Sequence, residues 1–209
     1  MVVASGQVHE SKYWHYPLGP AASELSEVED KERCRELIQA AVRKRLMSDV
    51  PIGVFLSGGI DSSIVVAEMR KVHSGTIKTF TIGFKDRAHS HLDETENAAL
   101  IANKFETQHT VIQLDPNDFS AIDEVVKHYG EPSGEISALP TYYVSKAARE
   151  YVTVALNGDG GDELFCGYPR MMLMNILHHI PAWSRPTAAK LGHLLPSDFS
   201  PKASSAKRA

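Results

Sequence analysis

The sequence is poor in the features that mark secreted, membrane and nucleic-acid-binding proteins. Its two cysteines, Cys34 and Cys166, are too few for a disulfide framework and lack metal-site spacing. No apolar run approaches ~20 residues, the length that spans a bilayer, and the start lacks the basic and apolar regions of a signal peptide. Lysine and arginine total 22 against 26 acidic residues, so the basic excess typical of nucleic-acid binding is missing. We therefore expect a cytoplasmic protein with small-molecule substrates and without a nucleic-acid or membrane partner.

The remaining composition is that of an ordinary globular domain. Of the 209 residues, 43% are hydrophobic and 23% are charged, which is enough for one well-buried core. Short apolar runs alternate with stretches of helical spacing, and Ser26 and Glu29 have the spacing of a capping box. This alternation predicts an α/β fold, a Rossmann-like parallel sheet with helices on both faces. The expected strands are 51–56, 78–84, 110–114 and 151–156, and the expected helices are 26–46, 63–72, 94–105, 116–129 and 140–150.

A glycine loop follows the first expected strand. Residues 57–62 read Ser-Gly-Gly-Ile-Asp-Ser and lie at the carboxyl end of the strand, where open parallel sheets bind ligands. Adjacent glycines let the backbone approach an anion, and the hydroxyls of Ser57, Ser62 and Ser63 can donate to it. Asp61 beside a phosphate requires a Mg2+ between them. The structural alternative is a glycine turn capped by Asp61, and a lysine-type P-loop is excluded because no Gly-Lys-Ser/Thr follows.

A second, acidic glycine loop follows the last expected strand. Residues 157–163 read Asn-Gly-Asp-Gly-Gly-Asp-Glu, with three carboxylates in five residues. Such close like charges cost energy unless a cation or a reaction requires them, although a solvated acidic turn is the simpler alternative. Together the two loops predict one site, in which the first presents donors to phosphate and the second presents carboxylates to a metal and to a reacting amine.

In this combination, the motifs resemble the glutamine-hydrolysing asparagine synthetase family. The resemblance covers roughly residues 10–170 and implies the C-terminal synthetase domain, with an α/β fold of the ATP-pyrophosphatase (PP-loop, adenine nucleotide alpha hydrolase-like) type. The similar stretches follow one another in the family's order: 48–63, 79–84, 93–94, 108–109, 131–132, 138–141, 158–165 and 167–168.

The resemblance also implies a reaction with ATP and Mg2+ as cofactors. Aspartate would be adenylated to β-aspartyl-AMP with release of pyrophosphate, and ammonia, from glutamine in the full enzyme, would then give asparagine. Asp159 would be catalytic and deprotonate the attacking ammonium, at a position where the family often has Glu. Asp61 and Asp162 would hold Mg2+. The implied ATP- and pyrophosphate-binding residues are Leu56 and Ile82 for adenine, Gly158 for the nucleotide, and Ser57, Gly58, Gly59, Asp61 and Ser62 for pyrophosphate.

Several departures from the family pattern point to a truncated synthetase domain. Val2 stands where the family's glutaminase half begins with a nucleophilic Cys, so we expect the glutaminase domain to be absent and glutamine not to be hydrolysed. The family also continues past Tyr168 with a basic segment, whereas this chain ends in a polar stretch. Two lesser departures are Asn157, where the family usually has Ser, and Cys166, where it usually has Ala or Gly. We expect a linker or arm at 1–23, the incomplete synthetase domain at 24–180 and a helical or disordered tail at 181–209.

Two alternatives to asparagine synthesis stay open at this point. A related amidotransferase could act on another carboxylate, in a sugar, a β-lactam precursor or a peptide, because the loop residues recognise ATP and not the acceptor. The chain could also be an inactive nucleotide-binding fragment. A homodimer is compatible with the sequence and is not specified by it.

Overall fold

The computed structural model divides the chain into two compact units, Met1–Ile38 and Gln39–Ala209. Each unit is described by itself below. The residues after Tyr168, which include the expected tail at 181–209, lie outside the described residues apart from three single positions. The described residues are 1–15, 25–84, 93–115, 117–131, 134–135, 137–168, 171, 174 and 181.

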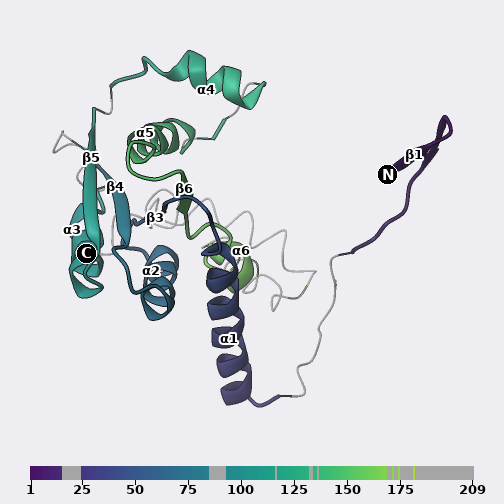
Figure 1. Ribbon diagram of the computed structural model, residues 1–209, viewed down its shortest axis with the longest axis horizontal. Coiled ribbons are helices and arrows are strands. Elements are labelled where there is room, and N and C mark those ends of the chain that lie inside the picture. Colours follow the sequence, from purple (N-terminus) through teal and green to yellow (C-terminus); the bar gives the residue numbers. More distant parts are fainter. Residues whose placement is uncertain are drawn as a thin grey trace. The chain divides into compact units, whose positions relative to one another are not determined.

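A four-stranded parallel sheet forms the centre of the second unit (Figure 1). Val54 is the register partner of both Thr79 and Leu156, so its strand lies between two parallel neighbours. One of these neighbours is the last strand of the sheet in sequence. This confirms the predicted parallel sheet and brings the carboxyl ends of these strands to one edge. The strands, in the order β5-β4-β3-β6, are β5 Gln108–Leu114, β4 Lys78–Phe84, β3 Ile52–Phe55 and β6 Val154–Leu156.

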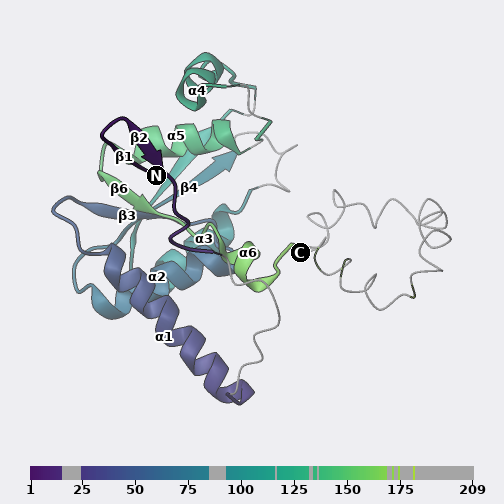
Figure 2. The ribbon, with the colours of Figure 1, turned by 90° about the vertical axis from the view of Figure 1, so that its right-hand side faces the viewer.

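Helices cover both faces of this sheet, as predicted (Figure 2). One face packs against α2 and α3, and the other packs against α5. No helix among the described residues is long and apolar enough to cross a membrane. The helices are α1 Glu27–Arg45, α2 Ile60–Val72, α3 Thr95–Lys104, α4 Ile122–Tyr129, α5 Ala138–Ala148 and α6 Gly161–Phe165.

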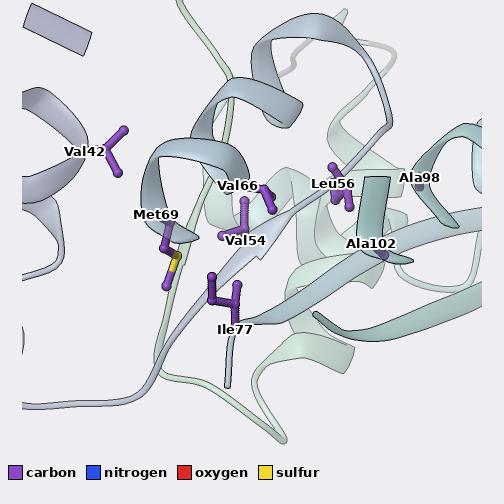
Figure 3. Close-up of a cluster of buried hydrophobic side chains, with 8 residues drawn as sticks. All are labelled: Val42, Val54, Leu56, Val66, Met69, Ile77, Ala98 and Ala102. Atoms are coloured by element: carbon purple, nitrogen blue, oxygen red, sulfur yellow. The ribbon is translucent and has the colours of Figure 1, made fainter. Parts of the chain in front are cut away.

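Strand β3 separates two apolar clusters because its side chains alternate between the faces. Phe55 points toward the α5 side with Phe80, whereas Val54 joins the larger cluster on the α2 side. Complete burial of one such side chain contributes about 1.5–3 kcal/mol, so the sheet is a firm base for the loops that follow its strands. Figure 3 shows the larger cluster, which consists of Val42, Val54, Leu56, Val66, Met69, Ile77, Ala98 and Ala102.

The first unit contains an antiparallel hairpin and the beginning of α1. The hairpin strands β1 Val2–Ala4 and β2 Gln7–His9 are exposed throughout and too short to show a two-residue period, so the sequence gives no signal for them. The predicted capping box is confirmed, because the Ser26 N–H donates to Glu29 Oε2 at 2.8 Å and the Glu29 N–H donates back to Ser26 Oγ at 3.4 Å. The Ser26 hydroxyl also donates to Glu29 Oε2, and this bond, together with the one from the Ser26 N–H, holds the pKa of Glu29 below its ordinary value.

Several element boundaries differ from the sequence expectation. Helix α4 begins at Ile122 rather than at 116, because the carboxylates of Asp115 and Asp118 accept the N–H groups of Asn117 and Ser120 in local turns. Helix α5 begins two residues before Pro140, which its first turn tolerates. Helix α2 begins at Ile60 rather than at 63, within the glycine loop. Strand β6 is shorter than expected because residues 151 and 152 still donate to Ala148 O in the turn that ends α5.

Candidate functional site

The two glycine loops meet at a cavity of about 670 Å3 at the carboxyl edge of the sheet. The cavity is lined by the ends of β3 and β4, by both loops and by the starts of α3 and α5. Of the residues predicted from the sequence, the lining contains Leu56, Ser57, Gly59, Asp61, Ser62, Ile82, Gly158, Asp159 and Asp162. Gly58 and Ser63, which the sequence also suggested for this site, are not part of the lining.

The first loop is held in shape by its own hydrogen bonds. The buried Ser62 hydroxyl accepts from the Ser57 N–H at 3.2 Å and lies 3.0 Å from Ser57 Oγ. Ser57 Oγ in turn accepts from the Gly59 N–H at 3.2 Å, and Ser63 Oγ donates to Gly59 O at 2.6 Å. The hydroxyls that the sequence suggested as phosphate donors therefore also hold the loop together.

Gly58 lets this loop approach helix α3. Its φ of 79° is in the left-handed region, and a Cβ added there would lie 2.6 Å from the backbone of both Asn97 and Ala98. A side chain at this position would collide with backbone atoms, which cannot move aside as a flexible side chain can. The contact fixes the loop against α3 and leaves the other side of the loop facing the cavity.

Helix α2 begins at the cavity without a side-chain cap. Its N-cap residue is Gly59, which has no side chain to accept the N–H groups of the first turn. Ile60, Asp61 and Ser62 form that turn and line the cavity, so their N–H groups and the positive end of the helix dipole are directed toward it. An uncapped helix start of this kind favours an anion such as a phosphate.

The second loop rests directly on the first. A Cβ at Gly161 would lie 2.4–2.7 Å from the carboxylate atoms of Asp61, and a Cβ at Gly158 would lie 2.7 Å from the Ser62 backbone nitrogen. Only glycine permits both approaches. Two loops that are about 100 residues apart in sequence are thereby in close contact at Asp61 and Ser62.

The second half of the acidic loop is helical. Helix α6 starts directly after Gly160, whose φ of 95° is left-handed, and ends at Cys166, also left-handed with a φ of 56°. The Asn157 amide donates to Asp159 Oδ2 at 2.6 Å. Asp159 precedes α6 in the sequence and Asp162 lies in its first turn, and both residues line the cavity.

Sequence reasoning gave no site role to the residues that α3 and α5 contribute to the lining. Glu94 lies at the start of α3, and partial burial raises its pKa although the residue as a whole is exposed. Burial also acts to raise the pKa of neighbouring Asp93, but hydrogen bonds from Thr95 and from the Phe84 N–H outweigh it and lower that pKa. The Asp-Glu pair at the carboxyl end of β4 was the available signal. The other lining residues without a predicted role include Glu135, Ser137, Pro140, Thr141 and Val144.

The cavity is strongly acidic. Its described lining contains six carboxylates and no lysine, arginine or histidine. A polyphosphate cannot enter such a cavity without cations that offset the repulsion. The six are Asp61, Glu94, Glu135, Asp159, Asp162 and Glu163.

The donor set fits a Mg2+ that arrives with a nucleotide. The Asp61 carboxylate lies against Gly161, the residue directly before Asp162, and both carboxylates line the cavity. Within the described part of the chain, no group of three or more His, Cys, Asp or Glu residues is arranged to hold a metal ion. Nucleotide-bound Mg2+ takes one or two carboxylates and completes its coordination with phosphate oxygens and water, so two carboxylates suffice.

Comparison with known proteins shows extended similarity. A family model described as asparagine synthase matches residues 33–209. A protein assigned as a glutamine-hydrolysing asparagine synthetase in Methanocaldococcus jannaschii is 37% identical over 194 residues, 88% of this chain and 36% of that protein. Asparagine synthetase [glutamine-hydrolyzing] 1 of Bacillus subtilis is 40% identical over 143 residues, 67% of this chain and 22% of that protein.

A solved structure is also similar in part. The NH3-dependent NAD synthetase of Campylobacter jejuni, in complex with nitrate, matches 69% of this chain and 61% of its own with 16% identity and a TM-score of 0.41. The matched stretch spans between a fifth and two fifths of the two curated relatives. On the strength of the family model and of the curated relatives, the chain belongs to the asparagine synthase family.

Proposed function

We propose that this chain carries the ATP-binding, carboxylate-activating part of a glutamine-hydrolysing asparagine synthetase. The observation that supports this most is the cavity in which the uncapped start of α2 and the acidic loop meet. One side offers N–H donors to an anion, and the other offers carboxylates to a cation. This is the pairing that Mg2+-ATP requires.

In this proposal, ATP binds across the ends of β3 and β4. The adenine lies at Leu56 and Ile82, where the Leu56 N–H already donates to Phe80 O at 2.8 Å, so the adenine would use other backbone groups. The phosphates lie at the glycine loop, from Ser57 to Ser62, and at Gly158. Asp61 and Asp162 would hold the Mg2+, whose positive charge would offset the negative charge of the phosphate oxygens.

Asp159 would accept the proton of the attacking ammonium. The Asn157 amide holds one of its carboxylate oxygens and thereby fixes its orientation. The other oxygen is then available to take a proton within hydrogen-bond reach. Asp is shorter than Glu by one C–C bond, about 1.5 Å, so the acyl-adenylate must lie close to this loop.

The test separates the two half-reactions. We expect Asp159→Asn to retain aspartate-dependent pyrophosphate release and to lower asparagine formation from ammonia by about 10²–10⁴-fold, the usual contribution of a general base. Asp162→Asn should instead lower Mg2+-dependent pyrophosphate release. If Asp159→Asn makes asparagine at the parent rate, Asp159 only caps the turn and its catalytic role is refuted.

A second candidate is nucleotide binding without completion of the ligase reaction. The described lining has no basic side chain that could hold the carboxylates of an acceptor, which favours this alternative for the isolated chain. It predicts Mg2+-ATP binding without pyrophosphate release in the presence of aspartate. Pyrophosphate release with a different carboxylic acid would instead support a related amidotransferase.

A further inference from the structure

Gly167 lies against the side chain of Asp162, the second residue of helix α6. A Cβ added at Gly167 would lie 1.8 Å from Asp162 Oδ1 and 2.8 Å from Asp162 Cγ. Both distances are well inside the separation of about 3.5–4.0 Å at which non-bonded heavy atoms pack. A side chain at position 167 and the present position of the Asp162 carboxylate therefore exclude each other.

The way in which α6 ends brings Gly167 to this place. The carbonyl oxygen of Asp162 accepts the N–H groups of both Cys166 and Gly167, the latter at 3.0 Å. The bond from Gly167 and the left-handed Cys166 are features of a Schellman motif, in which the residue after the left-handed one usually packs its side chain on the start of the motif. Here that residue has no side chain, and the Asp162 carboxylate occupies the space.

The turn after α6 is tied to the acidic first turn of the helix at two successive positions. Gly167 contacts the side chain of Asp162, and the Tyr168 hydroxyl donates to Glu163 Oε1. A helix of five residues is too short to be stable by itself, so contacts of this kind fix its shape. The position of the Asp162 carboxylate thus depends on residues that follow the helix.

We propose that Gly167 is a positioning residue for the Asp162 carboxylate. This inference rests on the proposed function, in which Asp61 and Asp162 hold the Mg2+ of ATP. The Asp61 carboxylate lies against Gly161 in a similar way, so each of the two carboxylates has a glycine beside it. Mg2+ demands near-ideal ligand geometry, and residues that orient metal ligands typically contribute about 10–100-fold in metal affinity.

Gly167→Ala tests this role without a change of backbone conformation. The φ of Gly167 is not in the left-handed region, and the two atoms nearest to the new Cβ belong to a flexible side chain that can move aside. The melting temperature should therefore stay close to that of the parent. In calorimetric titration of the whole chain, the affinity for Mg2+-ATP should fall about tenfold. The affinity for AMP in EDTA, which requires no bridging metal, should not change.

Cys166→Gly is the matched control in the same turn. It removes a Cβ from a left-handed residue and adds no atom beside Asp162. The melting temperature should rise, and the affinity for Mg2+-ATP should equal that of the parent. If Cys166→Gly weakened Mg2+-ATP binding as Gly167→Ala does, the effect would come from the turn as a whole and the proposal would be overturned.

A double-mutant cycle tests whether Gly167 acts through the carboxylate. Asp162→Ala removes the carboxylate, so Gly167→Ala added to it should cause no further loss of Mg2+-ATP affinity. A tenfold loss in both backgrounds overturns the proposal, as does a Gly167→Ala protein that binds Mg2+-ATP like the parent while Asp162→Ala binds it more weakly. An Asp162→Ala variant with parental affinity refutes the metal role of Asp162 and this inference with it. A parent that binds no Mg2+-ATP refutes the proposed function itself, so the failures are distinguishable.

Discussion

The two glycine loops serve one cavity but are held in different ways. The first, at 57–62, is bonded internally through serine hydroxyls and packed by Gly58 against α3, above the larger apolar cluster. The second, at 157–163, makes its close contacts with the first loop, through Gly158 and Gly161. Its acidic residues line the cavity.

The difference indicates an order of dependence within the site. The first loop is fixed by the body of the domain and can present its N–H groups before any ligand binds. The second loop is positioned by the first and adds charge that is unfavourable until a cation arrives. Changes to the first loop should therefore act mainly on stability, and changes to the second mainly on chemistry.

The largest expected effect comes from removing the cation. With six carboxylates in the lining, we expect ATP affinity to fall by about 10³-fold or more when Mg2+ is chelated, because the polyphosphate then meets uncompensated negative charge. Calorimetric titration with ATP in the presence of Mg2+ or of EDTA measures this. Equal affinity under both conditions would show that positive charge reaches the cavity from elsewhere in the protein.

The next effect tests how firmly the first loop is built into the fold. Gly58→Ala combines a left-handed backbone with a collision at 2.6 Å, and should cost about 3 kcal/mol of unfolding free energy. Gly130→Ala is the matched control, since its φ of 75° is similar but no atom of the described residues lies within 4 Å of the added Cβ. It should cost about 1 kcal/mol. If urea unfolding showed equal losses of unfolding free energy for the two variants, α3 would move aside and would not support the loop.

A third substitution acts on the contact between the loops. Alanine is favourable at Gly161 for helix α6 itself, but its Cβ would displace the Asp61 carboxylate. We expect Gly161→Ala to lower Mg2+-dependent pyrophosphate release by about 30-fold with little change in melting temperature, because a misplaced group costs rate without unfolding the protein. If Gly161→Ala retained the parental activity, the position of the Asp61 carboxylate would not matter for the reaction.

Much of this arrangement follows from the sequence, because strand periodicity and glycine loops are local signals. The parallel direction of the strands was predicted from their alternation with helices. The meeting of both loops at one sheet edge was predicted from the position of 57–62 and 157–163 after apolar runs. The roles of Asp61, Asp159 and Asp162 stay predictions, since geometry alone does not assign them.

What the sequence could not show depends on tertiary contact. The packing of Gly58 on Asn97 requires knowledge of which helix lies beside the loop. The late start of α4 depends on aspartate side chains that bond the preceding turn in place of the helix. The place of Glu94 in the cavity depends on where α3 begins relative to β4.

The smallest expected effects lie where α3 meets β4. The pKa is lowered at Asp93 and raised at the neighbouring Glu94, so the two side chains should affect stability in opposite directions. The pKa of Asp93 is lowered by hydrogen bonds from Thr95 and Phe84, which outweigh burial, so its contribution to stability is present above about pH 4 and is lost as pH falls through its folded pKa. Asp93→Ala should cost about 1 kcal/mol at neutral pH, as removal of a helix-start acceptor does, and less at about pH 3.

Glu94 should behave in the opposite way. Burial raises its pKa, so the folded state favours the protonated form, and that contribution is lost as pH rises above about 4. Because Glu94 is partly open to water, Glu94→Gln should raise the unfolding free energy at pH 7 by only about 0.3 kcal/mol, and by nothing at about pH 3. Asp123→Asn, at an exposed carboxylate of α4, is the control for a general charge effect.

A stability gain at Glu94 that comes with weaker Mg2+-ATP binding would mark its carboxylate as part of the site, because a group that costs stability where it stands is retained for function. Loss of stability in Glu94→Gln at pH 7 would instead show that the ionised carboxylate has a favourable partner in the fold.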